Sequence, residues 1–219
     1  MPATQVQVGS TGNISATDGS LVTQLGGKAG EGIIAELHGK YFTQTYRGNC
    51  FIGATASAGV IPPLPTATAQ TFALWNPAGS GKLLVPIKVS IGLVTVGVVT
   101  AHFCWSYLLN AGSNIGTAAP VSAHTLVAPV NAYLSGPGVA SAMRFAPATM
   151  TTLATAYLRP IGVSNFMATT PTAANMFWQL TEYYDGDMIV GPGTVVAIAN
   201  NIGAVATYGI AVTWEEVPI

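Results

Sequence analysis

The segment Gly79-Ser-Gly-Lys82 has the residue types that end a phosphate-binding loop. In such a loop the backbone amides surround the phosphates, the lysine reaches them, and a following Ser or Thr holds magnesium. The pattern fails on both sides here, because Asn76 stands where the first glycine is required and Leu83 stands where the hydroxyl is required. We therefore expect a hairpin turn followed by a solvent-facing lysine, with no nucleotide cofactor.

A thiol or hydroxyl beside an imidazole would supply a nucleophile and a base, so the cysteines and histidines are the candidate residues for such a site. None of them lies in the strand–turn–helix elbow that exposes a nucleophile. One pair, two residues apart on the same face of a predicted strand, has the spacing of two metal ligands, but a metal site needs more than two. We expect two buried free thiols, no catalytic residue and no metal. The residues are Cys50, Cys104, His38, His102 and His124, and the pair is His102 with Cys104.

Acidic residues gather at one place in the sequence. Glu182, Asp185 and Asp187 flank a predicted turn, and three carboxylates at a turn have the chemistry of a calcium site. An ordinary exposed turn contains as many carboxylates, so calcium binding is kept as an alternative. Glu215 and Glu216 are neighbours on a predicted strand, which points them to opposite faces and prevents them from acting as a paired acid and base.

The tryptophans and one tyrosine pair have two interpretations. Exposed aromatic rings are typical of carbohydrate-binding platforms, whereas buried rings dominate the packing of cores and subunit interfaces. Packing is the favoured interpretation, and a carbohydrate-binding module is the alternative. The residues concerned are Trp75, Trp105, Trp178, Trp214 and Tyr183-Tyr184.

Charge is scarce throughout the chain. Only 7% of the 219 residues are charged, against about 25% in an ordinary soluble domain. Seven Lys and Arg are too few to form the basic surface that nucleic acid requires, so nucleic acid is excluded as a partner. A net charge of −1 with few charges of either sign favours association. The expected partner is a second copy of the chain.

A run without Asp, Glu, Lys or Arg extends from Val89 to Met143, but its pattern argues against a membrane helix. Apolar residues alternate over 82–93 and again over 99–109, which is the two-residue period of a half-buried strand. In the first segment we expect the core face to carry Leu83, Val85, Ile87, Val89, Ile91 and Leu93. The N-terminus has neither a basic region nor an apolar one, so synthesis in a cytoplasm is expected.

Elements of three kinds must position these residues. Residues 1–30 are rich in Gly, Ser, Thr and Gln and are expected to form an extended arm that orders on a partner. Ile34, Leu37 and Tyr41 have helical spacing, so one short helix is expected within 31–47. Residues 1–48 are therefore treated as an N-terminal arm with a short helix, and 49–219 as the folded domain.

From Cys50 onward the sequence alternates between short strands and turns of Gly, Pro and Asn, with no helix between strands. About eight strands in this arrangement predict an all-β fold, an antiparallel two-sheet sandwich. The ending at 186–198, a strand, a Pro-Gly turn and another strand, favours a jelly roll among sandwiches. We expect the strands Val195–Ala199 and Ala206–Trp214 to form the last hairpin, with Ala206, Tyr208, Ile210, Val212 and Trp214 on one face.

Three segments, 36–49, 76–85 and 214–218, together resemble a family of mostly uncharacterised proteins from tailed bacteriophages and viral metagenomes. The resemblance extends from about residue 31 to 219, and its motifs are structural. By analogy with jelly-roll decoration and cement proteins, it implies a non-enzymatic virion protein that forms a trimer and docks on the major capsid protein or another virion protein. A tail or fibre component is the first alternative. The resemblance supplies no active-site residue, cofactor or membrane partner.

Overall fold

The computed structural model describes residues 39–67, 70–95, 97, 100–109, 129–136, 138–146, 155–164, 178–202 and 206–219. The chain divides into two compact units, Met1–Thr43 and Gln44–Ile219. A five-residue helix, α1 (Phe42–Tyr46), lies within the segment where a helix is expected. The helix ends at Tyr46, and Gly48 follows with a φ of 78°, the left-handed conformation that closes many helices. The arm 1–30, as well as Ile34 and Leu37, lies outside the described residues.

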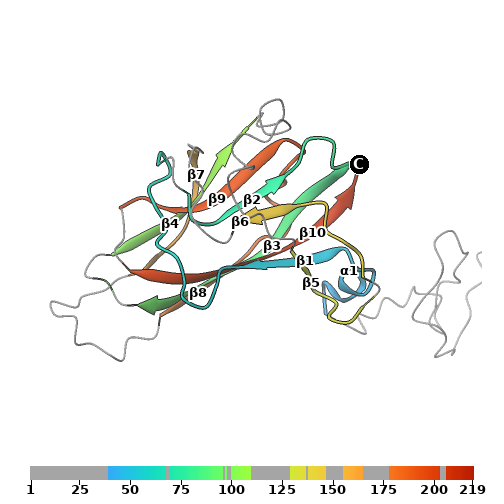
Figure 1. The fold of residues 1–219 in the computed structure, drawn as a ribbon, viewed down its shortest axis with the longest axis horizontal. Helices are drawn as coiled ribbons and strands as arrows, with labels where there is room; N and C mark the ends of the chain where they lie inside the picture. The colour runs from blue at the N-terminus through green and yellow to red at the C-terminus, as the bar shows by residue number, and fades with distance from the viewer. Residues whose placement is uncertain are drawn as a thin grey trace, which may run out of the picture. The chain divides into compact units, whose positions relative to one another are not determined.

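Ten strands form two antiparallel sheets within the described residues. Figure 1 labels each strand along the chain. In sheet 1 the strand order is β5-β1-β10-β3-β8, and in sheet 2 it is β6-β2-β9-β4-β7. The prediction of an all-β antiparallel sandwich is confirmed. The strands are β1 (Cys50–Ala54), β2 (Ala73–Asn76), β3 (Lys82–Thr95), β4 (Ala101–Leu108), β5 (Val130–Asn131), β6 (Arg144–Ala146), β7 (Ala156–Ser164), β8 (Gln179–Tyr183), β9 (Thr194–Asn200) and β10 (Thr207–Pro218).

Side chains from both sheets fill the core between them. On β10 the predicted face is confirmed, because Tyr208, Ile210, Val212 and Trp214 are all buried. On β4 the residues Ala101, Phe103 and Trp105 alternate into the same core. Rings make up much of the packing: Phe103 meets Tyr208 edge-on with the ring centres 4.8 Å apart. Large aromatic side chains thus supply volume that a chain rich in Ala and Gly otherwise lacks.

The expected core face of 82–93 is wrong for its first half. Leu84 is fully buried in the core, whereas Leu83 and Val85 are only half-buried. The register between β3 and β10 shifts between Thr213 and Trp214, where β3 contributes one extra residue. Such a bulge exchanges the inner and outer faces of a strand, since side chains alternate with a period of two. The prediction holds after the bulge, where Val89 and Ile91 are buried.

The expected last hairpin is also wrong. Thr194–Asn200 belongs to sheet 2 and pairs with β2 and β4, whereas β10 belongs to sheet 1 and pairs with β1 and β3. The turn after Asn76 likewise joins β2 of one sheet to β3 of the other. Alternation fixes which face of a strand is buried, but it does not specify the neighbouring strand.

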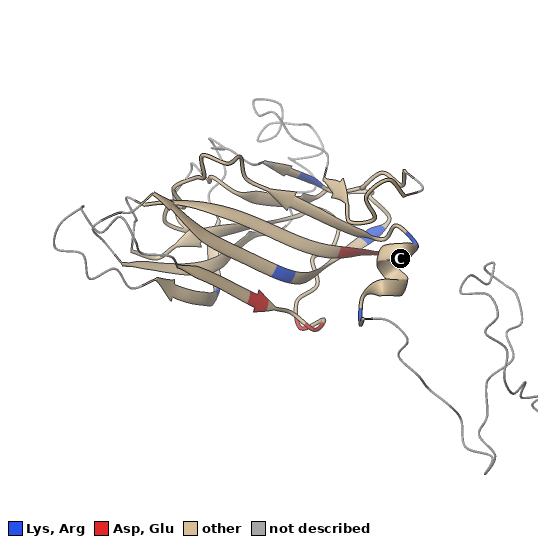
Figure 2. Cartoon of the chain, turned by 90° about the horizontal axis from the view of Figure 1, so that it is seen from below, with Lys and Arg blue, Asp and Glu red and all other residues tan. Residues whose placement is uncertain are grey.

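Charged residues remain sparse on this fold, as Figure 2 shows. Among the described residues, no helix has both the length and the apolar character needed to cross a membrane.

Candidate functional site: buried polar groups and exposed edges

The segment that partly matches a phosphate-binding loop forms a structural turn. Gly79 and Gly81 have φ values of 78° and 67°, which glycine adopts without strain. The buried side chain of Asn76 donates from Nδ2 to the carbonyl oxygens of Lys82 and Val190, at 2.9 Å each. The Ser80 hydroxyl donates to Asn76 Oδ1 at 2.6 Å. Asn76 therefore holds the connection between the two sheets in place.

Lys82 was expected to face solvent, but its side chain is only 26% exposed and is ion-paired. Its Nζ lies 2.9 Å from Glu216 Oε2, and the Glu216 side chain is fully buried. The Ser141 hydroxyl donates to Glu216 Oε1, and the Ala142 amide donates to Oε2 at 3.0 Å. We call these four residues the Glu216 cluster. The cluster joins β10, β3 and the segment before β6. The Glu216 carboxylate therefore connects three parts of the fold through its hydrogen bonds and ion pair.

Glu215, the neighbour of Glu216, is half-buried on the other face of β10, opposite Cys50. Burial raises the pKa of the Glu215 carboxyl. The two carboxylates are separated by the strand itself, in agreement with the alternation argument.

Both cysteines are buried free thiols, as expected. Burial raises the pKa of Cys104 to about 11. Burial also raises the pKa of Cys50, and a hydrogen bond with the Thr45 side chain partly opposes this. A thiol protonated at neutral pH is a poor nucleophile and a poor metal ligand.

His102 is exposed on the face of β4 that carries Cys104, but the Cys104 thiol donates at 3.4 Å to Asn201 Oδ1. His38 and His124 lie outside the described residues. In the described parts of the chain, no three His, Cys, Asp or Glu side chains gather closely enough to hold a metal ion.

Asp187, one of the acidic residues near 182–187, forms an ion pair with Arg159. Asp187 Oδ2 lies 2.7 Å from Arg159 Nη1 on β7. Glu182 lies on β8, opposite Val89 in the register with β3. Asp185 is exposed in the turn after β8. The structure therefore uses Asp187 to join β7 to the chain between β8 and β9.

Arg159 also covers a buried aromatic pair at this edge. Its guanidinium lies 4.7 Å from the centre of the Tyr184 ring. The Tyr184 hydroxyl accepts a hydrogen bond of 2.8 Å from Trp105 Nε1, and burial raises the Tyr184 pKa. A side chain at Gly162 of β7 would collide with Leu180 of β8. β7 and β8 thus close the same side of the sandwich.

Packing is the correct interpretation for most of the aromatic residues. Trp105, Trp214 and Tyr184 are buried in the core, and Trp178 packs against it. The outer face of sheet 1 has a shallow hollow of about 270 Å³ between Ala54–Ser57 and Gln179. Its lining contains Gly92, Gly209 and other small residues but no aromatic ring. It lacks the stacking surface that typically binds a sugar.

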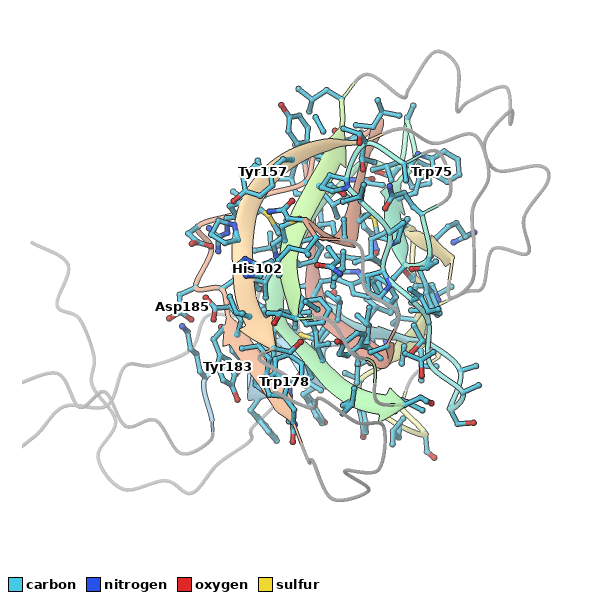
Figure 3. The ribbon with its side chains drawn as sticks, turned by 90° about the vertical axis from the view of Figure 1, so that its left-hand side faces the viewer. Trp75, His102, Tyr157, Trp178, Tyr183 and Asp185 are labelled. Carbon is cyan, nitrogen blue, oxygen red and sulfur yellow. The ribbon has the colours of Figure 1, made fainter. Side chains whose placement is uncertain are left out.

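Apolar side chains are exposed along the side closed by β7 and β8, and we call this set the β7–β8 edge. Figure 3 looks onto this side, with Tyr157 and Tyr183 near opposite ends of β7 and Trp75 across the molecule. Tyr183 is 64% exposed, which is unusual for a tyrosine on a strand. The set comprises Tyr157, Leu158, Val163, Tyr183 and Ile189.

A second exposed apolar set surrounds the short strand β5, and we call it the β5 edge. The rings of Tyr46 and Tyr133 stack with their centres 5.7 Å apart. Asn131 fixes this region, because its Nδ2 donates to the Gly48 carbonyl at 2.8 Å and its Oδ1 accepts from the Tyr133 amide. The set comprises Tyr46, Val130, Tyr133, Leu134 and Val139.

Sequence reasoning singled out Tyr183 as one of several aromatic residues but did not predict either edge as an exposed apolar set. Val121–Leu134 has a weak alternation in the sequence, and within its described part Val130 and Asn131 form strand β5. A cluster of aromatic and aliphatic residues among turn residues, as in 130–139, is the available signal.

No family model matches the chain, and no curated protein or solved structure matches it either. The resemblance to phage virion proteins therefore stays an expectation from the sequence.

Proposed function

We propose that the chain is a non-enzymatic structural protein of a bacteriophage virion. In this proposal it is a decoration or cement protein that forms a homo-oligomer, a trimer, and docks on the capsid lattice. The observation that carries the proposal is the pair of apolar edges on a sandwich with little charge. Exposed apolar groups of this kind mark surfaces that contact other proteins.

The strand order supports a jelly roll as the architecture. The chain passes between the two sheets at each step from β1 to β4 and again from β7 to β10. The order β1-β10-β3-β8 in one sheet faces β2-β9-β4-β7 in the other, which is the arrangement of two Greek keys. Viral capsid proteins, lectins and cupins all use the jelly-roll fold. The fold therefore does not identify the function, which must be argued from the residues at the surface.

The polar groups support a structural role over catalysis. Glu216, Cys104 and Tyr184 are buried titratable groups, and the side chain of each forms a hydrogen bond with another side chain of the fold. A catalytic group needs access to substrate and a partner that prepares it for reaction. These three have partners that hold the sandwich together.

Purified particles provide the test. Mass spectrometry of virions should detect the chain at many copies per particle, and antibodies against it should label the capsid surface in electron micrographs. Absence from particles would refute the proposal. Labelling of the tail alone would assign the chain to the tail or fibre apparatus instead.

The role of the arm has its own test. A chain lacking residues 1–30 should keep the circular dichroism spectrum of the sandwich but no longer join the particle, since the arm is proposed to dock on capsid subunits. Unchanged incorporation would show that docking uses another surface.

A further inference from the structure

We infer that residues 44–48, the end of α1 and the turn after it, form a cover over Cys50 that opens while the sandwich stays folded. Opening makes the Cys50 thiol available to a soluble electrophile. This is a conformational property of the chain itself, and it does not depend on the proposed virion role.

The burial of Cys50 is unusual for its position on the sheet. Phe51, the next residue on β1, belongs to the core, so Cys50 points to the outer face of sheet 1. The outward residues that follow on β1, Ile52 and Ala54, are half-buried and exposed, and Glu215 opposite Cys50 on β10 is half-buried. Cys50 itself is only 1% exposed. A local cover, and not the core, therefore excludes water from this thiol.

The segment just before β1 supplies this cover. The Thr45 side chain forms a hydrogen bond with the Cys50 thiol. The chain turns back at Gly48, whose amide donates to the Thr45 carbonyl at 2.9 Å. The Asn49 amide donates to the Gln44 carbonyl at 3.0 Å. These turn bonds hold Thr45 against the thiol at the start of β1.

The cover is held by surface contacts. α1 has five residues and buries no side chain, and helices of this length are marginal without tertiary packing. Asn131 Nδ2 donates to the Gly48 carbonyl at 2.8 Å, and the Tyr46 ring, 44% exposed, stacks on Tyr133. Segments with few buried apolar contacts open at a lower free energy than the whole domain. The segment 44–48 should therefore open before the sandwich unfolds.

Opening changes the chemistry of the thiol. In the closed state burial raises the pKa of Cys50, so the reactive thiolate is scarce and reagents cannot reach it. Once the cover opens, water surrounds the thiol, and its thiolate can attack iodoacetamide. A sulfur–carbon bond then forms as the carbon–iodine bond breaks, iodide leaves, and the thiol proton passes to the buffer. The rate of alkylation therefore measures the fraction of time that the cover is open.

The test measures alkylation of Cys50 in the native chain at urea concentrations below the unfolding transition. Peptide mass spectrometry assigns the label to Cys50 separately from Cys104, and tryptophan fluorescence measures global unfolding in the same samples. Cys50 should react at least about tenfold slower than in the unfolded chain, yet at least about tenfold faster than the globally unfolded fraction allows. Its rate should depend on urea less steeply than global unfolding does, because opening exposes less surface. Reaction at the unfolded rate, or only in proportion to global unfolding, would overturn the inference.

Two tyrosine variants test which contacts hold the cover closed. Tyr133→Ala removes the ring stacked on Tyr46 and should speed the labelling of Cys50 roughly two- to tenfold. Tyr157→Ala is the matched control on β7. Both rings are partly exposed, 37% and 47%, so both variants should keep the circular dichroism spectrum of the native chain. The control should leave the labelling rate unchanged, and equal rates for the two variants would overturn the inference.

Discussion

The Lys82–Glu216 and Arg159–Asp187 ion pairs each join a basic side chain to a carboxylate at similar lengths, 2.9 and 2.7 Å, but they have different surroundings. Glu216 is fully buried, and two further donors from Ser141 and Ala142 reach its oxygens. The Asp187 side chain is 56% exposed. Water can replace the partner of an exposed carboxylate, whereas a buried one depends on the protein for all its hydrogen bonds.

The few charged residues of this protein have two different roles, one inside the fold and one at its surface. At the Glu216 cluster, one carboxylate joins three parts of the chain that are far apart in sequence. At the β7–β8 edge, Arg159 covers Tyr184 and pairs with Asp187 beside exposed apolar side chains. The first arrangement should matter for folding, and the second for the properties of the edge.

The largest expected effect is that of Lys82→Met. It leaves the Glu216 carboxylate buried without a counter-charge, which should lower the free energy of unfolding by about 3–5 kcal/mol. Urea unfolding followed by tryptophan fluorescence measures this. Lys88→Met is the matched control, on the same strand and without an ion pair among the described residues, and should change stability by less than about 0.5 kcal/mol. Equal effects of the two variants would show that the buried pair has no special weight.

The next largest effect is expected from the buried Cys104 thiol, which should make the free energy of unfolding depend on pH. The Cys104 pKa rises to about 11 in the folded chain from an ordinary value of 9.0, so the unfolded chain ionises first. The free energy of unfolding should therefore fall from pH 9 upward, by roughly 2 kcal/mol at pH 11. Chemical unfolding across this range should show the loss, and Cys104→Ala should reduce it. A loss unchanged in Cys104→Ala would assign it to other groups.

Ser141→Ala should have a smaller effect on the Glu216 cluster. It removes one donor but leaves Lys82 and the Ala142 amide in contact with the carboxylate. The free energy of unfolding should fall by about 1.5 kcal/mol, the usual contribution of a hydrogen bond to a charged group. In a double-mutant cycle, Ser141→Ala with Lys82→Met should deviate from additivity because both contact Glu216. Strict additivity would argue against a coupled cluster.

The smallest effect is expected from Asp187→Asn at the exposed pair. It should lower the free energy of unfolding by about 0.2–1 kcal/mol at low salt, and the difference should decrease in 1 M NaCl. Thermal unfolding at both salt concentrations measures this. A loss as large as that of Lys82→Met would mean that the exposed pair is no less important than the buried one.

Much of the fold follows from local patterns in the sequence. The alternating face Tyr208–Trp214 and the turns around Gly79 and Gly186 were predictable, because each depends on a residue's own side chain or backbone freedom. The burial of Leu84 was not predictable, because the bulge opposite Trp214 depends on how β3 pairs with β10.

The candidate surfaces were less predictable than the fold. Whether Tyr183 is exposed and its neighbour Tyr184 is buried depends on Trp105 and Arg159, which come from other strands. The Glu216–Ser141 contact joins residues 75 positions apart, and no local pattern indicates such a pairing.

The sequence by itself determined the strand-rich class, the scarcity of charge and the buried face of β10, because period and composition are local quantities. Only the tertiary structure decided which sheet each strand joins, that Lys82 is paired, and which apolar side chains remain exposed near β5, β7 and β8. The physical reason is that burial depends on neighbours from distant parts of the chain, which a strand's own alternation does not specify.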